Sequence, residues 1–415
     1  MSNILVGLDI GSTNIRVVAA EVLESGELQI IGVGVAPSTG LRRGSVINIE
    51  KTVEGINSAV ESAEMMSGVE IFECSVGIGG NHIEGFNSRG VYPVSDKGNG
   101  NKEIDHTDIK FVIDSAKAVV IPMDREVIHV IPQTYTVDRQ TGIKDPTNMI
   151  GVRLEAEVHI ITGSGTSVQN IIKCANRANL QVSRFMHQGL ASVKSIMTSD
   201  EANMGSVLID IGSGTTDVVA MLDGAPVMTF SLPIGGYQVT NDLSVVKNIP
   251  FEAAEEVKIS NGCCWMELLD SQEAVLLAGV GGRPPIQLSK KEICEIIQMR
   301  IQEIFLIIKD RISGVFKNQN ITGSIILCGG GSLLPGITEL AGSVFNTSSV
   351  RLGIPGMLGG LTGEYRNPQF SVVLGLLLDL HENNNNTIKE TYYHKDNNKT
   401  DSFGKKVKSF WNNLF

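Results

Sequence analysis

Two related stretches of the chain combine the residue types that can bind a phosphorylated ligand. The stretch Asp9-Ile-Gly-Ser-Thr-Asn-Ile-Arg-Val-Val18 aligns with Asp210-Ile-Gly-Ser-Gly-Thr-Thr-Asp-Val-Val219, with six of ten positions identical. Glycine lets the backbone approach a ligand closely, so that consecutive N–H groups converge on an anion, and Ser and Thr add hydroxyl donors. Mg²⁺ usually keeps several waters and takes one or two carboxylates. The repeat therefore predicts a phosphate clamp in which Asp9 and Asp210 flank one Mg²⁺ through water.

The binding residues of this clamp are expected in the turns of two β-hairpins. In each copy an apolar run, Ile4 to Leu8 or Val207 to Ile209, precedes the turn and a β-branched run follows it. A single Asp-x-Gly turn occurs in many plain hairpins, but two related copies half a chain apart are much harder to obtain by chance. The residues assigned to binding are Asp9, Gly11, Ser12, Thr13 and Asn14 in the first turn and Asp210, Gly212, Ser213, Gly214, Thr215 and Thr216 in the second.

A glycine-rich turn lies further along the chain. Ser324 to Cys328 predicts a buried strand, and a helical pattern begins near Pro335. A flat ligand could lie on the turn between them, although three glycines could also merely permit two segments to cross closely. Neither G-x-G-x-x-G nor G-x-x-x-x-G-K-[ST] occurs, which disfavours the two commonest nucleotide-binding folds. The turn residues assigned to binding are Gly329, Gly330, Gly331 and Ser332.

Composition limits the classes of protein to consider. The chain has 415 residues, 42% of them hydrophobic, which predicts two or three globular domains. Its formal charge of −11 would repel nucleic acid, so no nucleic-acid partner is expected. Six cysteines without a C-x-x-C pair indicate unpaired thiols in a reducing compartment. The N-terminus lacks a basic region and a cleavage site, and no apolar run approaches the ~20 residues that span a bilayer, so a cytoplasmic location is expected.

The order and spacing of the three motifs resemble those of the actin, Hsp70 and sugar kinase superfamily. The resemblance implies an α/β, actin-like two-lobed ATPase fold, with duplicated mixed β-sheet domains closing on ATP and Mg²⁺. It also assigns Gly235 and Gly236 to the ligand, and Glu255 and Lys258 to the nucleoside. On a helix, Glu255 and Lys258 share one face at i and i+3, where they could equally form a plain surface ion pair.

The superfamily resemblance also suggests how far catalysis goes. A Gln or Glu at the start of the first interdomain helix often positions the attacking water, and Gln188 occupies the comparable place here. An uncharged amide can orient water but is a poor general base. We therefore expect ATP and Mg²⁺ to bind, with slow or undetectable turnover.

Within the superfamily the chain most resembles the FtsA family of bacterial cell-division proteins. The strings that carry this resemblance bind no nucleotide: His129 to Gln133, Gly142 to Pro146, Gly151 to Arg153, Gly189 to Ser192 and Gly281 to Pro285. The resemblance implies a protein that polymerises on the inner face of the cytoplasmic membrane at the division septum. It also implies that FtsZ filaments are tethered there and that other division proteins are recruited. The alternatives are a sugar or carboxylate kinase, a pilus-associated actin-like ATPase and an Hsp70-like chaperone.

The same resemblance, with the local patterns, divides the chain into segments. An inserted small α/β subdomain, specific to the FtsA family, interrupts the first lobe, and the C-terminal tail changes in composition after Leu380. The expected ranges are 1–80, 163–200 and 366–381 for the first lobe, 81–162 for the insertion, 201–365 for the second lobe, 382–402 for a disordered linker and 403–415 for an amphipathic helix.

The last 13 residues predict a membrane-binding helix. Their apolar side chains fall on one side at 100° per residue, and three lysines but no acid accompany them. One short helix should bind lipid weakly, whereas a filament with many such helices gains avidity. A helix that packs on the body of the protein or on a partner is the alternative. The residues assigned to lipid are Phe403, Lys405, Lys406, Val407, Lys408, Phe410, Trp411, Leu414 and Phe415.

Overall fold

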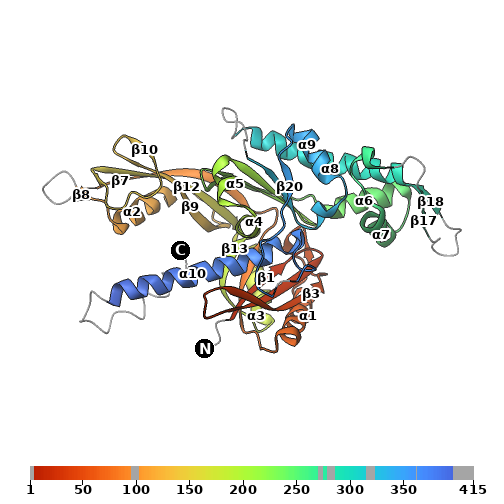
Figure 1. The fold of residues 1–415 in the computed structure, drawn as a ribbon, viewed down its shortest axis with the longest axis horizontal. Coiled ribbons are helices and arrows are strands. Elements are labelled where there is room, and N and C mark those ends of the chain that lie inside the picture. Colours follow the sequence, from red (N-terminus) through yellow and green to blue (C-terminus); the bar gives the residue numbers. More distant parts are fainter. Residues whose placement is uncertain are drawn as a thin grey trace.

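The computed structural model describes residues 4–94, 102–269, 274–277, 286–314, 323–360 and 362–395. These residues form two α/β lobes and an elongated extension (Figure 1). Two large β-sheets organise them, and the long helices are α1 (Ile49–Ser67), α8 (Lys290–Ser313) and α10 (Ser371–Lys395). The shorter helices are α2 (His106–Lys117), α3 (Gly165–Arg177), α4 (Gln188–Ile196), α5 (Ser199–Met204), α6 (Gly236–Lys247), α7 (Phe251–Asn261) and α9 (Ile337–Phe345).

The first lobe is built on a five-stranded sheet in the order β13-β6-β1-β2-β3. Alternate residues of β1 enter different cores: Val6 and Leu8 pack with residues of α1 and α3, whereas Leu5 packs with residues of α10. Because successive strand residues point to opposite faces, this apolar run is that of a strand covered on both sides. The strands are β1 (Ile4–Ile10), β2 (Asn14–Val22), β3 (Leu28–Pro37), β6 (Glu73–Ile78) and β13 (Gln181–His187).

The second lobe contains the other predicted hairpin within a nine-stranded sheet. Its strand order is β10-β9-β12-β7-β16-β15-β14-β19-β20, and β14 pairs with β19 in parallel. A core that includes Ile209, Phe305 and Leu340 joins this sheet to α8 and α9. The strands of this lobe are β14 (Ser206–Ile211), β15 (Thr216–Leu222), β16 (Ala225–Leu232), β19 (Ile325–Cys328) and β20 (Val350–Leu352), and β17 (Ala274–Leu277) and β18 (Ile286–Ser289) pair in a separate small sheet.

The inserted segment leaves the first lobe after β6 and returns at α3. It has a core of its own around Val112, Leu154 and Val158. Its sheet, however, is continuous with that of the second lobe, because β7 meets β16 at a single register pair, Phe230 and Glu84. Its strands are β7 (Glu84–Pro93), β8 (Lys102–Glu103), β9 (Arg125–Val137), β10 (Gln140–Ile143), β11 (Ile150–Gly151) and β12 (Arg153–Ser164).

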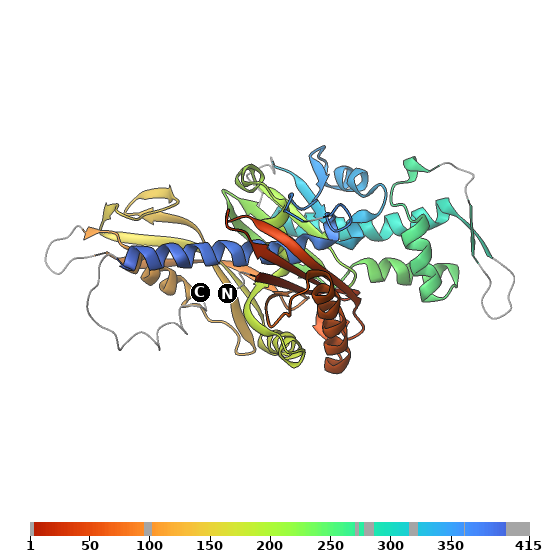
Figure 2. The same cartoon turned by 60° about the horizontal axis from the view of Figure 1, so that its bottom comes forward.

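The last described helix is longer than the sequence predicts. We expected a disordered linker from residue 382, but α10 continues through Lys395 and extends toward the end of the molecule that carries the insertion (Figures 1 and 2). The expectation is therefore wrong for residues 382–395. Extending an existing helix fixes one residue per hydrogen bond, so polar residues can continue a helix that the apolar core has nucleated. The predicted lipid-binding residues, 403–415, lie outside the described part of the chain.

Two further expectations concern thiols and membrane spans. All six cysteines are unpaired and buried, as the sequence predicts. In the described ranges, no helix combines the length and the apolar character that a bilayer crossing requires.

Candidate functional site

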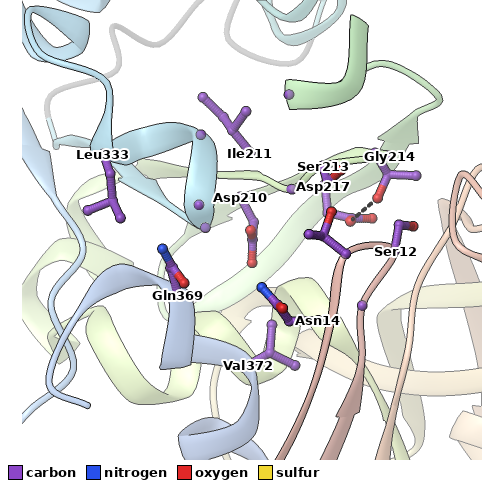
Figure 3. A pocket seen from close by; sticks show the side chains of 18 of the residues that line it. Ser12, Asn14, Asp210, Ile211, Ser213, Gly214, Asp217, Leu333, Gln369 and Val372 are labelled. Carbon is purple, nitrogen blue, oxygen red and sulfur yellow. Dashed lines mark hydrogen bonds between the residues drawn. The ribbon is translucent and has the colours of Figure 1, made fainter. Parts of the chain in front are cut away.

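The three predicted motifs meet at one cavity between the lobes. The cavity has a volume of about 330 Å³. In Figure 3, Asp210 from the second lobe and Asn14 from the first point toward the same space, with Gln369 at its edge. The predicted residues that line it are Asp9, Gly11, Ser12, Thr13, Asn14, Gln188, Asp210, Gly212, Ser213, Gly214, Thr215, Gly236, Glu255, Lys258, Gly329, Gly330 and Gly331.

Three residues that the sequence assigned to the ligand do not line the cavity. The Thr216 hydroxyl donates to the Ile234 carbonyl (2.8 Å), and the Ser332 hydroxyl donates to the Gly329 carbonyl (2.7 Å). The Gly235 N–H donates to Gln238 Oε1 at 2.9 Å, at the start of α6. These groups hold the loops in shape. The sequence motif alone does not distinguish residues that stabilise a loop from residues that line the cavity.

The two hairpins place different partners opposite their aspartates. In β1 and β2, Asp9 lies directly across from Arg16, whereas in β14 and β15 Asp210 lies across from Asp217. Arg16 Nη1 lies 3.8 Å from Asp9 Oδ2. Like charges directly opposite one another on antiparallel strands are destabilising. The first hairpin is therefore neutralised within itself, and the second concentrates negative charge.

Burial makes these carboxylates reluctant to ionise. It raises the pKa of Asp9 to about 6, with the Asp210 charge adding and Arg16 opposing. Burial, together with the neighbouring Asp210 charge, raises the pKa of Asp217 to about 7. Among the described residues, the buried Asp217 Oδ1 has no hydrogen-bond partner. A cation at this end of the cavity would relieve both the burial penalty and the repulsion.

Asp210 is held in place from two sides. The Ser192 hydroxyl of α4 donates to Asp210 Oδ2 at 2.9 Å. On the other side Gly329 adopts φ 78°, and a Cβ at this position would lie 2.3 Å from Asp210 Oδ1. The first glycine of the turn is therefore required both by its backbone conformation and by the close approach of the carboxylate.

Gln188 reaches the cavity wall at the start of α4. Its amide nitrogen donates to Asp9 Oδ1 at 2.9 Å. This contact orients both side chains toward the end of the cavity where the two hairpin turns meet. A role for Gln188 in positioning water stays a prediction.

Glu255 and Lys258 form the ion pair that their spacing predicts, and they also line the cavity. Lys258 Nζ donates to Glu255 Oε2 at 2.7 Å, to Thr240 Oγ1 at 2.9 Å and to the Gly236 carbonyl at 3.2 Å. Only 13% of the Lys258 side chain is exposed, so the pair belongs to the cavity wall. The Glu255 side chain is 35% exposed, and a role of the pair in binding a nucleoside stays a prediction.

Several lining residues were missed by the sequence analysis. A signal existed for two of them, because Arg16 and Asp217 occupy the same position of the aligned repeat with opposite charge. Ile10 and Ile211 lie inside the two repeated turns, and Leu333 to Pro335 directly follow the glycine-rich turn, whereas the remaining ones come from segments without a ligand-binding pattern. The missed residues are Ile10, Arg16, Gly44, Ile211, Asp217, Ile259, Ile301, Leu333, Leu334, Pro335, Gln369, Ser371 and Val372.

The predicted metal ligands are close to each other but do not form a complete ligand set. Asp9 from the first lobe and Asp210 from the second both line the cavity. Within the ranges that the structure describes, no group of three or more His, Cys, Asp or Glu side chains is arranged to hold a metal ion. Contact with Mg²⁺ through water stays a prediction.

Comparison with known proteins identifies the family. A family profile described as "Cell division protein FtsA" matches residues 207–375, and one described as "SHS2 domain inserted in FTSA" matches residues 80–162. A protein of Borreliella burgdorferi named "Cell division protein FtsA" is 44% identical over 381 residues, which cover 92% of this chain and 91% of the relative.

Solved structures confirm the actin-like fold class. The structure of a "PilM-PilN type IV pilus biogenesis complex" has a TM-score of 0.65 at 16% identity and covers 90% of this chain and 98% of its own. MreB 5 of Spiroplasma citri bound to AMPPNP has a TM-score of 0.55 at 13% identity and covers 95% of this chain and 99% of its own. At such identities the likeness shows the fold alone, and the sequence relatives carry the assignment. The chain belongs to the FtsA family of cell division proteins.

Proposed function

We propose that this protein is an actin-like, ATP-binding cell-division protein that links division filaments to the cytoplasmic membrane. The observation that carries the proposal is the meeting of Asp9, Asp210 and Gly330 on one cavity from two lobes. The two hairpin turns would clamp the phosphates, and the ion pair of Glu255 and Lys258 would bind the nucleoside. Mg²⁺ would neutralise the phosphate charge and would be held, through water, by Asp9 and Asp210.

Nucleotide binding is tested by filling the cavity. A Cβ at Gly330 meets no atom within 4 Å, so Gly330→Val should leave the fold intact while its side chain takes up ligand space. Gly363 has equally open surroundings and does not line the cavity, so Gly363→Val is the matched control. Calorimetric titration with ATP and Mg²⁺ should show binding to the wild-type protein and to Gly363→Val, and strong loss with Gly330→Val. Equal binding by all three would contradict the proposed site.

The membrane link is proposed for residues 403–415. The apolar face and the three lysines of this segment support it. Full-length protein should sediment with anionic vesicles, and protein lacking 403–415 should not. The matched pair is Trp411→Ala, on the apolar face, and Asn413→Ala, outside it. Undiminished binding by the truncated protein would show that the anchor lies elsewhere.

The partners follow from family membership and belong to the same proposal. FtsZ, other division proteins and a second copy of this chain are the expected partners at the division septum. Purified FtsZ should be recruited to anionic vesicles only when the full-length protein and ATP are present. Recruitment by the protein lacking 403–415 would contradict the tether. A soluble metabolic kinase is not favoured, because close relatives that span about nine-tenths of this chain are division proteins.

We also propose that ATP binding and contacts with other proteins are carried by different domains, with the bounds expected from the sequence. Residues 1–80, 163–200 and 366–381 with residues 201–365 form the ATP-binding lobes, and residues 81–162 contribute to contacts with other proteins. The separate core of the inserted segment supports this division. Hydrolysis is expected to be slow, because the one predicted water-positioning side chain, Gln188, carries no charge.

A further inference from the structure

The two basic side chains that line the described part of the cavity both face acidic residues. Among the described residues that line it, the basic ones are Arg16 and Lys258. Arg16 Nη2 donates to Gln369 Oε1 at 2.8 Å, and its guanidinium lies 5.3 Å from the centre of the Phe370 ring and faces Asp9. Lys258 is held by Glu255 at the proposed nucleoside end. A triphosphate would therefore meet the carboxylates without a free basic side chain opposite them.

A small hairpin brings two arginines to this end. Strands β4 (Leu41–Arg42) and β5 (Ser45–Val46) pair with each other, and Arg43 and Gly44 form the turn between them. Gly44 lines the cavity, and its N–H donates to Ser12 Oγ at 3.3 Å. The turn thus lies against the first phosphate-binding loop.

The same turn also touches the second lobe. A Cβ at Gly214 would lie 3.0 Å from both the N and the Cα of Arg43, and 2.7 Å from Ser12 Oγ. Gly214 is therefore required by the close approach of the Arg43 backbone. The two predicted phosphate loops and the β4–β5 turn meet at one place, at the boundary between the lobes.

Arg43 has a backbone conformation that is unfavourable for an arginine. Arg43 has φ 52° and Gly44 has φ 75°, as the central residues of a type I′ turn require. Such turns favour Asn, Asp or Gly, and an arginine with positive φ is uncommon. Both Arg42 and Arg43 are exposed, and within the described part of the chain neither side chain makes a hydrogen bond or an ion pair. No contact of the Arg43 side chain with the described residues accounts for this backbone conformation, and uncompensated strain of this kind points to a function.

We infer that Arg43 is the phosphate-binding cation that the cavity wall does not supply. With ATP bound in the proposed site, on which this inference rests, the Arg43 guanidinium contacts the terminal phosphate. Guanidinium groups bind phosphate oxygens in a bidentate manner, and Arg side chains are well suited to this contact. The contact ties the β4–β5 turn of the first lobe to the Gly214 loop of the second. Arg43 thereby makes the site prefer ATP over ADP.

The test compares two nucleotides on the full-length protein. Calorimetric titration with ATP and with ADP, both with Mg²⁺, is carried out on the wild type, Arg43→Asn and Arg42→Asn. Arg43→Asn should weaken ATP binding by roughly ten- to a hundredfold, as loss of a charged hydrogen bond does, and ADP binding by less than about threefold. Its thermal midpoint without nucleotide should stay equal or rise, because Asn tolerates positive φ. Arg42→Asn should keep the wild-type preference.

The outcomes separate this inference from the proposed function. If the wild type binds both nucleotides and Arg43→Asn keeps the same ratio of ATP to ADP affinity, the assignment of Arg43 is overturned while the site stands. If the wild type binds neither nucleotide, the proposed function fails and the inference falls with it. Arg43→Lys, which keeps the charge, should retain more of the preference for ATP than Arg43→Asn. Equal losses from both variants would overturn the role of the charge.

Discussion

The two repeated hairpins have the same turn sequence but opposite electrostatic design. Across the strands, Asp9 faces Arg16, whereas Asp210 faces Asp217. The first hairpin therefore carries its own countercharge before any ligand arrives. The second buries two neighbouring carboxylates, and Asp217 Oδ1 has no hydrogen-bond partner among the described residues. The two lobes therefore contribute unequally, and a metal–phosphate ligand would stabilise the second lobe more than the first.

Removing Arg16 should have the largest effect, because the first hairpin depends on its internal neutralisation. Arg16→Met leaves Asp9 buried without its cation, and breaking a buried ion pair from one side costs about 3–5 kcal/mol. Urea denaturation at pH 8 measures this loss. At pH 5, below the Asp9 pKa of about 6, the carboxyl is protonated in the folded state and the loss should shrink.

The control for this substitution is an exposed arginine. Arg177 lies 3.0 Å from Glu50 with 51% of its side chain exposed, so Arg177→Met should change stability far less. A loss from Arg16→Met that is as large at pH 5 as at pH 8 would mean that Arg16 acts through packing rather than through neutralisation of Asp9.

Removing the Asp217 charge should raise the stability of the protein, whereas Arg16→Met lowers it, and the change should be somewhat smaller. The pKa of Asp217 is about 7 in the folded protein and 3.8 ordinarily, so the folded state holds the extra proton between these values. Stability therefore falls as the pH rises from about 4 to 7, by on the order of 2–4 kcal/mol. Asp217→Asn should remove the part of this decline above about pH 6, whereas Asp9 still contributes below it, and the variant should be more stable than the wild type at pH 8. A wild-type pH profile in this variant would show that Asp217 is not the titrating group.

The sequence predicted the repeat but not the contrast within it. Turn glycines, hydroxyls and flanking β-branched runs are local signals, so both hairpins and the meeting of Asp9 with Asp210 could be expected from the residues and the resemblance. Which residues face each other across two strands depends on the register of their pairing. The apolar pattern of a single strand does not fix that register until the partner strand is known. Arg16 and Asp217 were visible in the alignment as opposite charges at the same position. The difference has a large energetic effect only because both side chains are largely buried, where solvent does not screen their charges.

Other parts of the site could not be predicted because they come from distant, unpatterned segments. Gln369 and Ser371 reach the cavity because α10 packs across the first-lobe sheet, and nothing in their local sequence indicates a ligand. Gly44 reaches it through a two-residue turn with no apolar period. The end of α10 was also misplaced, since polar composition shows where the core ends and not where the helix ends.

Loss of the Asp210 charge should reduce the contribution of Mg²⁺ to ATP binding more than it reduces ATP binding without the metal. Asp210→Asn keeps the shape of the side chain and an acceptor for the Ser192 hydroxyl, but it removes the charge that would attract Mg²⁺. The gain in ATP affinity from Mg²⁺ relative to EDTA should fall about tenfold, which corresponds to ~1.4 kcal/mol. Thermal midpoints without nucleotide serve as the control for folding. An unchanged gain from Mg²⁺ would place the metal elsewhere.

The smallest effect is expected at the proposed nucleoside end of the cavity, which is formed by elements other than the two hairpins. Glu255→Gln keeps an acceptor for Lys258 but removes the ion pair, so it should weaken ATP, ADP and adenosine alike, by about two- to fivefold, as loss of one modest hydrogen bond does. Calorimetric titration with the three ligands tests this. Uniform loss is the signature of a group that contacts only what the three ligands share. A loss confined to ATP would place Glu255 at the phosphate end and would reverse the proposed orientation of the nucleotide between the two lobes.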